Sequence, residues 1–565
     1  MIMAELPLDD APELSPRQRQ ILDLLRAGKV NKEIANELGI GLGTVKQHIV
    51  AIFKKLKVRN RAAAVSCDLQ RGQPEAEAPV FAAGLLERRP CVVLSLVLAP
   101  EQGEAGGEHQ GLMRLLHQSL AAYAFDHDAV FLARHQCAGD LIFGIRSACT
   151  QDVYRAVLAA RLVYRAVAAT DGRLAQALRG AITAGLAVVS INRRGVWSGE
   201  AMASGAIAEA RDMAAACAAG ALQLAPQACA VLNALGPVPL GPVTDCLHFS
   251  TVDHLVWQES AGDPPVAAGL LGRSRELRQI AAWLAQSLVR RRGLFLLEGE
   301  IGMGKSTLCR RIAHEGWLRG WRLRHFFALH DLDGPSLRQL PEGLPVAAQA
   351  VCDEPAGSPA DVPEILLIDD ANLLPGPLLA SLVEACARQG RLLLLAGRRF
   401  PAAIGNPDAA LRLGRLAPEA TVALLQAAAT QCAAEAGAAR FRQAPWAELA
   451  EVVCGVPLFA CEMARASQQQ PGTGLTLALR LAIAARLDPM GLDRLLLRQV
   501  ARGEAELAGC REGPELAEKI GVSLEVLSIL IEQAIEAGVL RRGDQGRLAF
   551  VHPLLRQAIL QSEIS

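Results

Sequence analysis

The sequence predicts a multidomain protein in which an all-α N-terminal region is followed by domains that mix α-helices and β-strands. Three observations lead to this fold class. The chain has 565 residues, which is too long for a single hydrophobic core. Two stretches rich in proline, glycine and alanine, 71–87 and 236–266, are typical of linkers. Beyond the first linker, short apolar runs typical of buried strands alternate with helical patterns.

Composition limits the class of protein. Hydrophobic residues make up 51% of the chain, which excludes general disorder, yet no apolar run approaches the ~18 residues that a membrane-spanning helix needs. The first residues, MIMAELPLDDAPEL, lack the basic start and apolar middle of a secretory signal, so we expect a cytoplasmic protein without a membrane partner. The 14 cysteines stand singly, without a CxxC pair, and we expect reduced thiols with neither zinc nor disulfides.

Residues 13–70 are predicted to form a small all-α helix-turn-helix domain. Their apolar residues recur at helical spacing in three blocks, and glycines interrupt the chain between the second and third blocks. Ser15 is suited to cap the first helix, with Pro16 at its first position. Between residues 13 and 65 there are 11 Lys and Arg against 4 Asp and Glu, although the whole chain has no net charge. Such a basic region favours nucleic acid as a partner.

The third predicted helix carries the candidate DNA contacts. Its leading turn and outer face present Lys46, Gln47 and His48, which are placed to meet base edges in a major groove. Lys54 follows about two helical turns later, where a cation can meet a backbone phosphate. A small helical bundle with a solvated basic face is the alternative interpretation of the same pattern.

Four stretches of this region, LSPRQRQIL, NKEIANELGI, GTVKQHIVAIFKKL and VRNRAAAV, resemble the LuxR-type DNA-binding domain in order and spacing. The resemblance implies double-stranded DNA as a partner and a role in dimerisation for the helix after Asn60. Gln18 and Gln20 depart from the family pattern, which usually has glutamate there. The DNA contacts that the resemblance implies are Thr44, Lys46, Gln47, His48 and Lys54.

Residues 88–235 are predicted to form an α+β domain. A strand at 91–98, a helix at about 112–124, a hairpin within VFLARHQCAGDLIFGIR, a helix at 152–168 and a strand ending in AITAGLAVVS follow one another. This order, with the block GEAMASG before a further helix, resembles the catalytic domain of class III nucleotide cyclases.

Such cyclases use two carboxylates to hold two metal ions over the triphosphate. The first strand here, CVVLSLVLA, contains no carboxylate, so only Asp140 remains. The family's catalytic Asn and Arg positions fall on Ala208 and Asp212, and an adjacent register would bring in Arg211. We therefore expect a degenerate, catalytically inactive cyclase-like domain that serves ligand sensing or dimer contact.

The stretch GEIGMGKS, residues 299–306, matches the phosphate-binding pattern GxxxxGK[ST]. The apolar strand GLFLLE precedes it and the helical pattern TLCRRIAHEG follows it, which is the context that the pattern requires. Backbone N–H groups would converge on phosphates at the helix N-terminus, Lys305 would pair with the β- and γ-phosphates, and Ser306 would ligate Mg²⁺. The sequence therefore predicts ATP or ADP with Mg²⁺, bound through Gly299, Gly302, Gly304, Lys305, Ser306 and Thr307.

Two further apolar strands of this region end in charged residues. EILLIDD ends in Asp369, which we expect to reach Mg²⁺, and Asp370, which is placed to orient or activate water. RLLLLAGRR ends with Arg398, where a cation can sense the γ-phosphate. Strands alternating with helices predict a doubly wound α/β ATPase core over residues 267–405. Ordinary surface charges at strand ends remain the alternative for Asp370 and Arg398.

Three motifs resemble those of STAND-class ATPases. LLGRSREL is similar to their entry motif, which implies that Gly272 and Arg273 lie near the adenine. CGVPLFACEMA resembles their GxP motif, with Pro457 at the base site on a small helical domain. FVHPLLRQAIL resembles the signature of their winged-helix domain, in which a histidine, here His552, approaches the phosphates. A core histidine with its hydrogen bonds satisfied is the alternative for His552.

The C-terminal region is predicted to be a winged helix that does not contact DNA. Two helices, a strand, a GDQG turn and a second strand follow one another. The helix suited to enter a groove, at about 523–537, carries three glutamates and no Lys or Arg, so a phosphate backbone would repel it. We expect this domain to pack on the ATPase core. The predicted helical and winged-helix domains span 406–480 and 481–565.

Together these resemblances imply a STAND-type, ATP-dependent transcription regulator. Nucleotide state would control homo-oligomerisation and DNA binding, a small-molecule or protein inducer would trigger nucleotide exchange, and slow ATP hydrolysis would reset the switch. The cyclase-like domain is the candidate sensor. Two alternatives remain open: an active nucleotide cyclase with DNA-binding regulation, and a DNA-remodelling motor.

Overall fold

The computed structural model divides into two compact units, Met1–Ala83 and Gly84–Ser565, which are described separately. In the first unit, helix α1 (Pro16–Arg26) begins at the proline expected at the first helical position, and it buries Ile21 and Leu22. The structure describes residues 16–26, 52, 85–98, 107–134, 138–170, 176–199, 202–235, 246–248, 270–290, 292–318, 322–327, 364–374, 376–388, 390–400, 404–435, 444–469, 475–505, 510–543 and 546–564.

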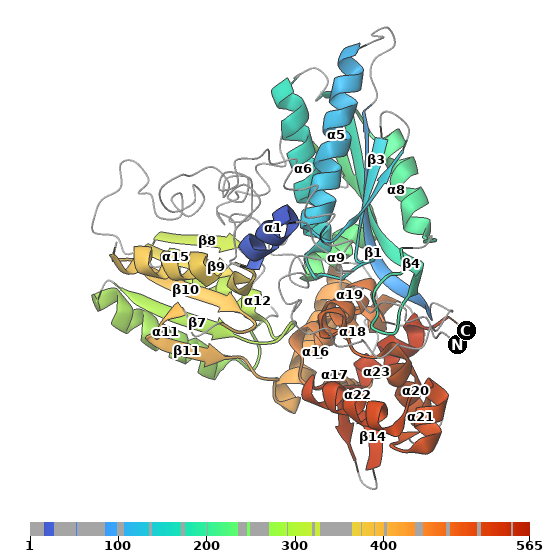
Figure 1. Cartoon of the computed structure of the whole chain (residues 1–565). Helices are drawn as coiled ribbons and strands as arrows, with labels where there is room; N and C mark the ends of the chain where they lie inside the picture. The colour runs from blue at the N-terminus through green and yellow to red at the C-terminus, as the bar shows by residue number, and fades with distance from the viewer. Residues whose placement is uncertain are drawn as a thin grey trace, which may run out of the picture. The chain divides into compact units, whose positions relative to one another are not determined.

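The second unit begins with a domain built on a six-stranded sheet, which we call the six-stranded domain (residues 85–248; Figure 1). The strand order is β2-β3-β1-β4-β5-β6, and neighbours run antiparallel except β4 and β5, which are parallel. Its strands are β1 (Leu85–Leu98), β2 (Val130–Ala133), β3 (Ala138–Phe143), β4 (Leu178–Ile191), β5 (Ala221–Leu224) and β6 (Cys246–His248). Its helices are α5 (Gly107–Asp126), α6 (Asp152–Thr170), α8 (Gly205–Ala216) and α9 (Pro226–Leu235).

Both faces of this sheet are covered by helices. Val92 and Leu94 of β1 pack with α5, α6 and α9, whereas Cys91 and Val93 pack with α8. A strand that is buried on both faces needs no polar alternation, which explains the continuous apolar run CVVLSLVLA. Strand β6 lies within the stretch 236–266 that the composition predicts as a linker, so part of that stretch belongs to the sheet.

A five-stranded parallel sheet forms the next domain, called the five-stranded domain (residues 270–412), with the order β11-β7-β10-β9-β8 (Figure 1). Leu294 and Leu296 of β7 pack with α15, whereas Phe295 and Leu297 pack with α11 and α12. Helices therefore cover both faces, as a doubly wound sheet requires. The elements are α11 (Ser274–Arg290), β7 (Gly293–Glu298), α12 (Lys305–Leu318), β8 (Arg322–Phe327), β9 (Glu364–Asp369), η3 (Ala371–Leu373), α15 (Gly376–Arg388), β10 (Leu392–Gly397) and β11 (Ala409–Arg412).

Helices α16 to α20 join this sheet to a small C-terminal domain (residues 510–564). There, two helices and two strands follow in the order expected for a winged helix, and β12 completes a sheet of order β12-β14-β13. No helix in the described part of the chain is long and apolar enough to cross a membrane. The elements are α16 (Pro418–Glu435), α17 (Trp446–Val453), α18 (Pro457–Gln469), α19 (Leu477–Leu487), η5 (Asp488–Met490), α20 (Arg494–Ala505), β12 (Cys510–Arg511), α21 (Pro514–Ile520), α22 (Leu524–Glu536), β13 (Leu540–Arg542), β14 (Arg547–Phe550) and α23 (Pro553–Ser562).

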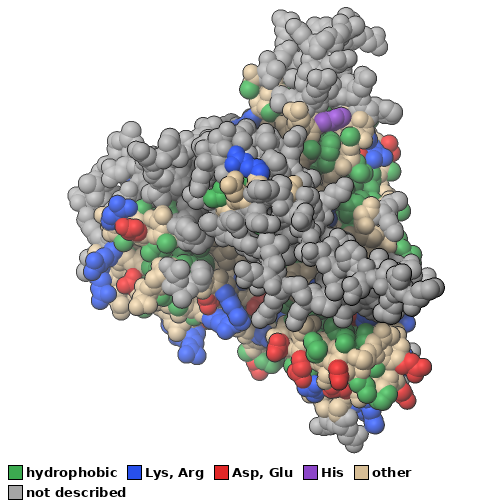
Figure 2. Space-filling view, viewed as in Figure 1, with side chains coloured by type: hydrophobic (Ala, Val, Ile, Leu, Met, Phe, Trp, Pro, Cys, Tyr) green, Lys and Arg blue, Asp and Glu red, His purple; other side chains and the backbone are tan. Residues whose placement is uncertain are grey.

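Helix α22 is the acidic helix that was predicted to pack on the neighbouring domain instead of contacting DNA. Its residues Leu527 and Ile531 are buried in the same hydrophobic core as residues of α11, β7 and α12. The outer side of α22 carries both apolar and acidic residues. Figure 2 shows hydrophobic side chains beside acidic ones over the C-terminal domain, at the bottom of the view. The exposed apolar residues are Leu524 (54%), Val526 (43%) and Ile529 (57%).

Candidate nucleotide-binding site

The phosphate-loop sequence lies between β7 and the N-terminus of α12, at the carboxyl edge of the five-stranded sheet. Gly302 and Gly304 have φ angles of +81° and +88°, a conformation that residues with a Cβ rarely adopt. The turn directs the chain into the first turn of α12, where unsatisfied N–H groups and the helix dipole favour an anion. The loop therefore has the backbone geometry that a phosphate site needs.

Lys305 is the first residue of α12 and is buried. Its Nζ donates to the carbonyl oxygens of Gly299 (2.8 Å) and Glu300 (3.1 Å), so the ammonium group lies across the loop. Burial lowers the pKa of Lys305, and the charges of Asp370 and Asp369 oppose this effect. Ser306 and Thr307 follow on the same first turn and are half-buried.

The two predicted carboxylates lie together at the end of β9. Asp369 is its last residue and is buried, and its Oδ1 accepts a hydrogen bond from the backbone N–H of Asp370 at 3.0 Å. Asp370 has a left-handed backbone with a φ of +52°, an unusual conformation for a residue other than glycine. Burial and the charge of Asp369 raise the pKa of Asp370 to about 6, while Lys305 and Arg398 act to lower it. These four residues form one electrostatic cluster.

Arg398 directly follows β10 and is exposed. Its backbone N–H donates to the side chain of Asn372 at 2.9 Å, which fixes the strand end beside the carboxylates. A Cβ on Gly397 would come within 2.7 Å of Asn372, so this glycine allows the close approach. The sequence interpretation missed Asn372, although it lies two residues after Asp370.

A pocket beside the phosphate loop is lined by Arg273 and Pro457, two of the three residues predicted at the base site. Nη2 of Arg273 donates to the carbonyl oxygens of Met303 (3.2 Å) and Gly414 (2.6 Å), and Nη1 donates to Glu276 (2.9 Å). Arg273 therefore connects the entry turn to the phosphate loop and to the strand that leads into α16. The residues lining the pocket are Leu270, Leu271, Arg273, Met303, Gly304, Leu308, Leu413, Leu416 and Pro457.

Gly272 lies next to this pocket rather than in its lining. Its φ is +78°, and an added Cβ would come within 2.5 Å of the Cβ of Ala420 on α16. Helices α16 to α20, called the helical segment, also contact the phosphate loop directly. The backbone N–H of Leu458, in α18, donates to the carbonyl oxygen of Gly302 at 3.1 Å. The entry turn, the phosphate loop and the start of α18 are thus held against one another.

His552 lies at the N-terminus of α23 and is buried. Its Nδ1 accepts from the backbone N–H of Leu554 at 3.1 Å, and its Nε2 lies 3.2 Å from the carbonyl oxygen of Val453. The neutral ring with its proton on Nε2 satisfies both contacts. In this arrangement the imidazole is bound to protein groups, so a contact with phosphate requires it to leave Val453.

The expected cyclase residues form an ion-paired cluster. Asp140 is fully buried, and its two carboxylate oxygens lie 2.9 Å from Arg134 and 2.9 Å from Arg211. Arg134 also donates to the hydroxyl of Ser95 at 2.6 Å, and Ser95 is the β1 residue that pairs with Asp140. Of the two registers considered for the catalytic arginine, the adjacent one selects Arg211, and Arg211 is indeed paired with Asp140. Arg134 was missed because only the sheet pairing reveals its position.

The candidate DNA contacts Thr44, Lys46, Gln47, His48 and Lys54 lie outside the described residues. Residues 12–67 match the family model of bacterial regulatory proteins, luxR family. GerE, the spore germination protein of Bacillus subtilis, is 40% identical over 73 residues, which cover 13% of this chain and 99% of GerE. The transcriptional regulatory protein DesR of Bacillus subtilis is 41% identical over 63 residues, which cover 11% of this chain and 32% of DesR. Four curated relatives, including DesR, are matched over only 24% to 32% of their length.

Solved structures give likenesses of low score. The guanylyl cyclase Cya2 has a TM-score of 0.22 at 15% identity, covering 26% of this chain and 80% of that chain. A STAND protein with a tetratricopeptide repeat sensor from Pyrococcus horikoshii has a TM-score of 0.20 at 14% identity, covering 49% and 41%. The resemblances to cyclases and to STAND ATPases therefore stay predictions. The predicted LuxR-type helix-turn-helix is confirmed, and through residues 12–67 the chain belongs to the luxR family of bacterial regulatory proteins.

Proposed function

We propose that this protein is an ATP-dependent transcription regulator that binds double-stranded DNA through its N-terminal helix-turn-helix. One observation carries the proposal: a chain of the luxR family also holds Lys305, Asp369 and Asp370 together at a phosphate loop. Nucleotide state controls homo-oligomerisation, and an oligomer presents several DNA-binding segments at once. Paired half-sites then bind far more tightly than one.

The nucleotide is ATP or ADP. The base binds beside Arg273 and Pro457, where the small pocket widens to admit it, and the phosphates meet Lys305 and the N-terminus of α12. Mg²⁺ fits the donors present, because it takes oxygen ligands and is usually held by one or two carboxylates together with substrate phosphates. A site with one carboxylate, Asp369, and one hydroxyl, Ser306, suits a cation that also takes phosphate and water oxygens. When bound, Mg²⁺ neutralises charge on the β- and γ-phosphates.

Hydrolysis is slow and resets the switch. Asp370 orients the attacking water or accepts its proton, and Arg398 is placed to meet charge that develops on the γ-phosphate. The raised pKa of Asp370 suits a group that accepts a proton near neutral pH. His552 and Val453 hold the C-terminal domain against the helical segment beside the GxP motif. A small-molecule or protein inducer promotes nucleotide exchange, for which the six-stranded domain is the proposed sensor.

The test is DNA protection and molecular mass of the full chain, measured with ATP and with ADP. We expect protection in one nucleotide state, its loss in Lys46→Ala and His48→Ala, and an unchanged mass in Lys305→Ala whichever nucleotide is added. Protection that survives the two helix-turn-helix substitutions, or that is absent in every nucleotide state, would refute the proposal.

The alternative function, an active nucleotide cyclase, has less support. Two guanidinium groups already neutralise Asp140, and its neighbour on the paired strand is Ser95 rather than a second carboxylate. A lone carboxylate between two cations is a poor site for two divalent metals. Metal-dependent formation of a cyclic nucleotide that disappears in Asp140→Ala would establish the alternative.

A further inference from the structure

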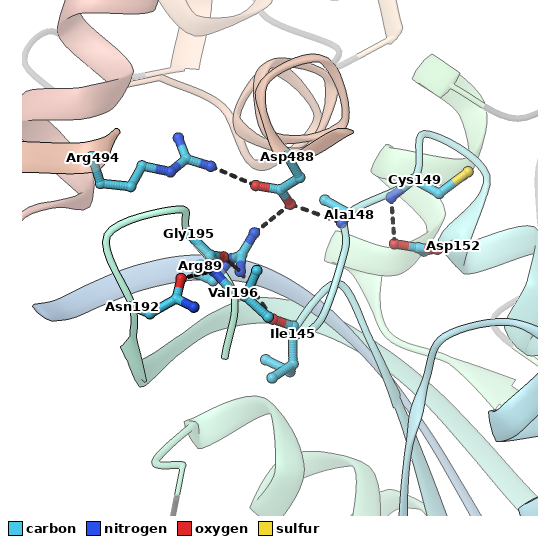
Figure 3. A network of polar contacts seen from close by, with 10 residues as sticks. All are labelled: Arg89, Ile145, Ala148, Cys149, Asp152, Asn192, Gly195, Val196, Asp488 and Arg494. Carbon is cyan, nitrogen blue, oxygen red and sulfur yellow. Dashed lines mark hydrogen bonds and ion pairs between the residues drawn. The ribbon is translucent and has the colours of Figure 1, made fainter. Parts of the chain in front are cut away.

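The loop between β3 and α6, residues 144–151, connects the six-stranded domain to two other parts of the second unit. On one side, the backbone N–H of Ala148 donates to Oδ2 of Asp488, at the end of α19, at 2.9 Å (Figure 3). The loop is closed within its own domain by the backbone N–H of Cys149, which donates to Asp152 at 2.9 Å (Figure 3). The C-terminal half of the loop is therefore held both by its own domain and by Asp488.

Asp488 is a buried anchor for this loop. Its carboxylate is paired with Arg89 of β1 and, at 2.7 Å, with Arg494 of α20 (Figure 3). Arg89 is also buried, and it donates to the carbonyl oxygens of Ile145 (3.0 Å) and Gly195 (2.8 Å). A buried carboxylate that is shared between two guanidinium groups and an N–H group resists displacement. The loop is thus fastened to the junction between α19 and α20.

On its other side the same loop reaches the candidate nucleotide site. Nε2 of Gln151 donates a hydrogen bond to Oδ2 of Asp370, which lies 219 positions later in the chain. Gln151 is 5% exposed. Ile301 of the phosphate loop packs against the core of the six-stranded domain, together with α19. This domain therefore contacts both the phosphate loop and the carboxylate proposed to act on water.

An amide donor on Asp370 has a direct chemical consequence. A carboxylate oxygen that accepts a proton donor from a side chain is less available and less basic toward a water molecule. The donor is buried and belongs to a loop that is itself fastened at Asp488, so a shift between the domains would carry the amide away from Asp370. We propose that Gln151 restrains the ATPase: the six-stranded domain holds the carboxylate of Asp370 away from water until the domains separate. This inference rests on the proposed ATP hydrolysis.

The test compares ATP hydrolysis by the full chain with that of Gln151→Ala. Loss of one hydrogen bond to a charged group is expected to raise kcat about tenfold. The rise is expected in kcat alone, with the KM for ATP unchanged, because the partner of Gln151 is Asp370, which is proposed to act on water and not to bind the nucleotide. A purely structural role of Gln151 would not raise kcat while leaving KM in place. Thr150→Ala, in the same loop, is the matched control and is expected to keep the wild-type kcat and KM.

A second variant guards against a folding defect in Gln151→Ala. Gln151→Asn keeps the amide but is one methylene shorter, so it is expected to raise kcat in the same way. A rate that stays unchanged in both variants would overturn the inference. A rate that falls in both would also overturn it, because Gln151 would then be a residue that orients water. The proposed function would fail independently of this inference if neither wild type nor Gln151→Ala bound ATP, or if Asp370→Asn left the rate of ATP hydrolysis unchanged.

Discussion

Nε2 of His552 lies 3.2 Å from the carbonyl oxygen of Val453, which places the histidine against the last turn of α17. Its ring also packs edge-on against Phe459 of α18, with centroids 5.0 Å apart. His552 therefore joins the C-terminal domain to both helices that flank the GxP motif. The contact with Val453 uses Nε2, whereas the cap of α23 uses Nδ1, so a substitution can remove one and keep the other.

We predict that His552→Ala lowers the free energy of unfolding by about 2 kcal/mol, because it removes an N-cap and leaves a buried carbonyl without its donor. His552→Asn is expected to lose roughly half of that, since its side-chain oxygen can still cap α23. Urea denaturation of the two variants measures the difference. Equal losses in both would mean that the contact with Val453 contributes all of the effect.

The contact of His552 also predicts a pH dependence of stability. Burial, with smaller contributions from Arg415 and Arg486, lowers the pKa of His552 from 6.5 to about 4, despite the hydrogen bond to Val453. The unfolded chain therefore takes up a proton that the folded chain does not, and stability falls as the pH is lowered from about 6.5 to 4. The unfolding free energy of wild type minus that of His552→Asn should therefore fall by up to roughly 3 kcal/mol across this window and change sign. A constant difference would contradict the prediction.

Asp370 sets the expected pH dependence of hydrolysis. Its pKa is raised to about 6, chiefly by burial and then by Asp369, and only the ionised form can accept a proton from water. The rate at saturating ATP and Mg²⁺ should therefore fall as the pH is lowered through about 6. Asp370→Asn should be about 100-fold slower or more and should lack this limb, with nucleotide affinity retained. An unchanged acid limb in Asp370→Asn would assign the titration to another group.

The buried ion pairs at Asp488 predict where the second unit is vulnerable. Asp488→Asn leaves the guanidinium of Arg89, which is 1% exposed, without its counter-charge. Breaking a buried pair in this way costs about 3–5 kcal/mol, so calorimetry should show the six-stranded domain unfolding at lower temperature than in wild type. Glu512→Gln, which removes the exposed partner of Arg542, is the control and should change little.

Local patterns were sufficient to predict several elements of the second unit and the strand-loop-helix context of the glycine-rich loop. Apolar runs of strand length became β1, β7, β9 and β10, and the glycine-rich loop lies between a strand and a helix as the pattern requires. The strand-end positions predicted for Asp369, Asp370 and Arg398 agree with the structure, because the apolar run that forms each strand stops just before these residues. The predicted linker 236–266 was partly wrong, because the pairing of β6 with β5 depends on a distant strand and not on composition.

Long-range contacts could not be predicted in this way. Gln151 and Asp370 are 219 positions apart, and neither the spacing nor the chemistry of either residue identifies the other. The same holds for Arg134, which reaches Asp140 only because β2 and β3 are paired. His552 was expected at the phosphates from its motif, whereas its observed partner is a backbone carbonyl, a group that carries no sequence signature.

Gly272 provides a test of how the entry turn supports the nucleotide site. Its φ of +78° and the 2.5 Å approach of an added Cβ to Ala420 mean that Gly272→Ala introduces both backbone strain and a clash with α16. Gly405→Ala is the matched control, because Gly405 has a φ of +92° but no atom within 4 Å of an added Cβ. The control should lose only the strain, about 1–2 kcal/mol of unfolding free energy, and Gly272→Ala should lose about 1–3 kcal/mol more from overpacking.

Because Arg273 adjoins this turn and bonds to Met303 of the phosphate loop, Gly272→Ala should also weaken ADP binding, measured by calorimetric titration, whereas Gly405→Ala should not. Equal ADP affinity in the two variants would show that the entry turn can move without disturbing the phosphate loop, and the base would then have to be held by the remaining pocket residues alone.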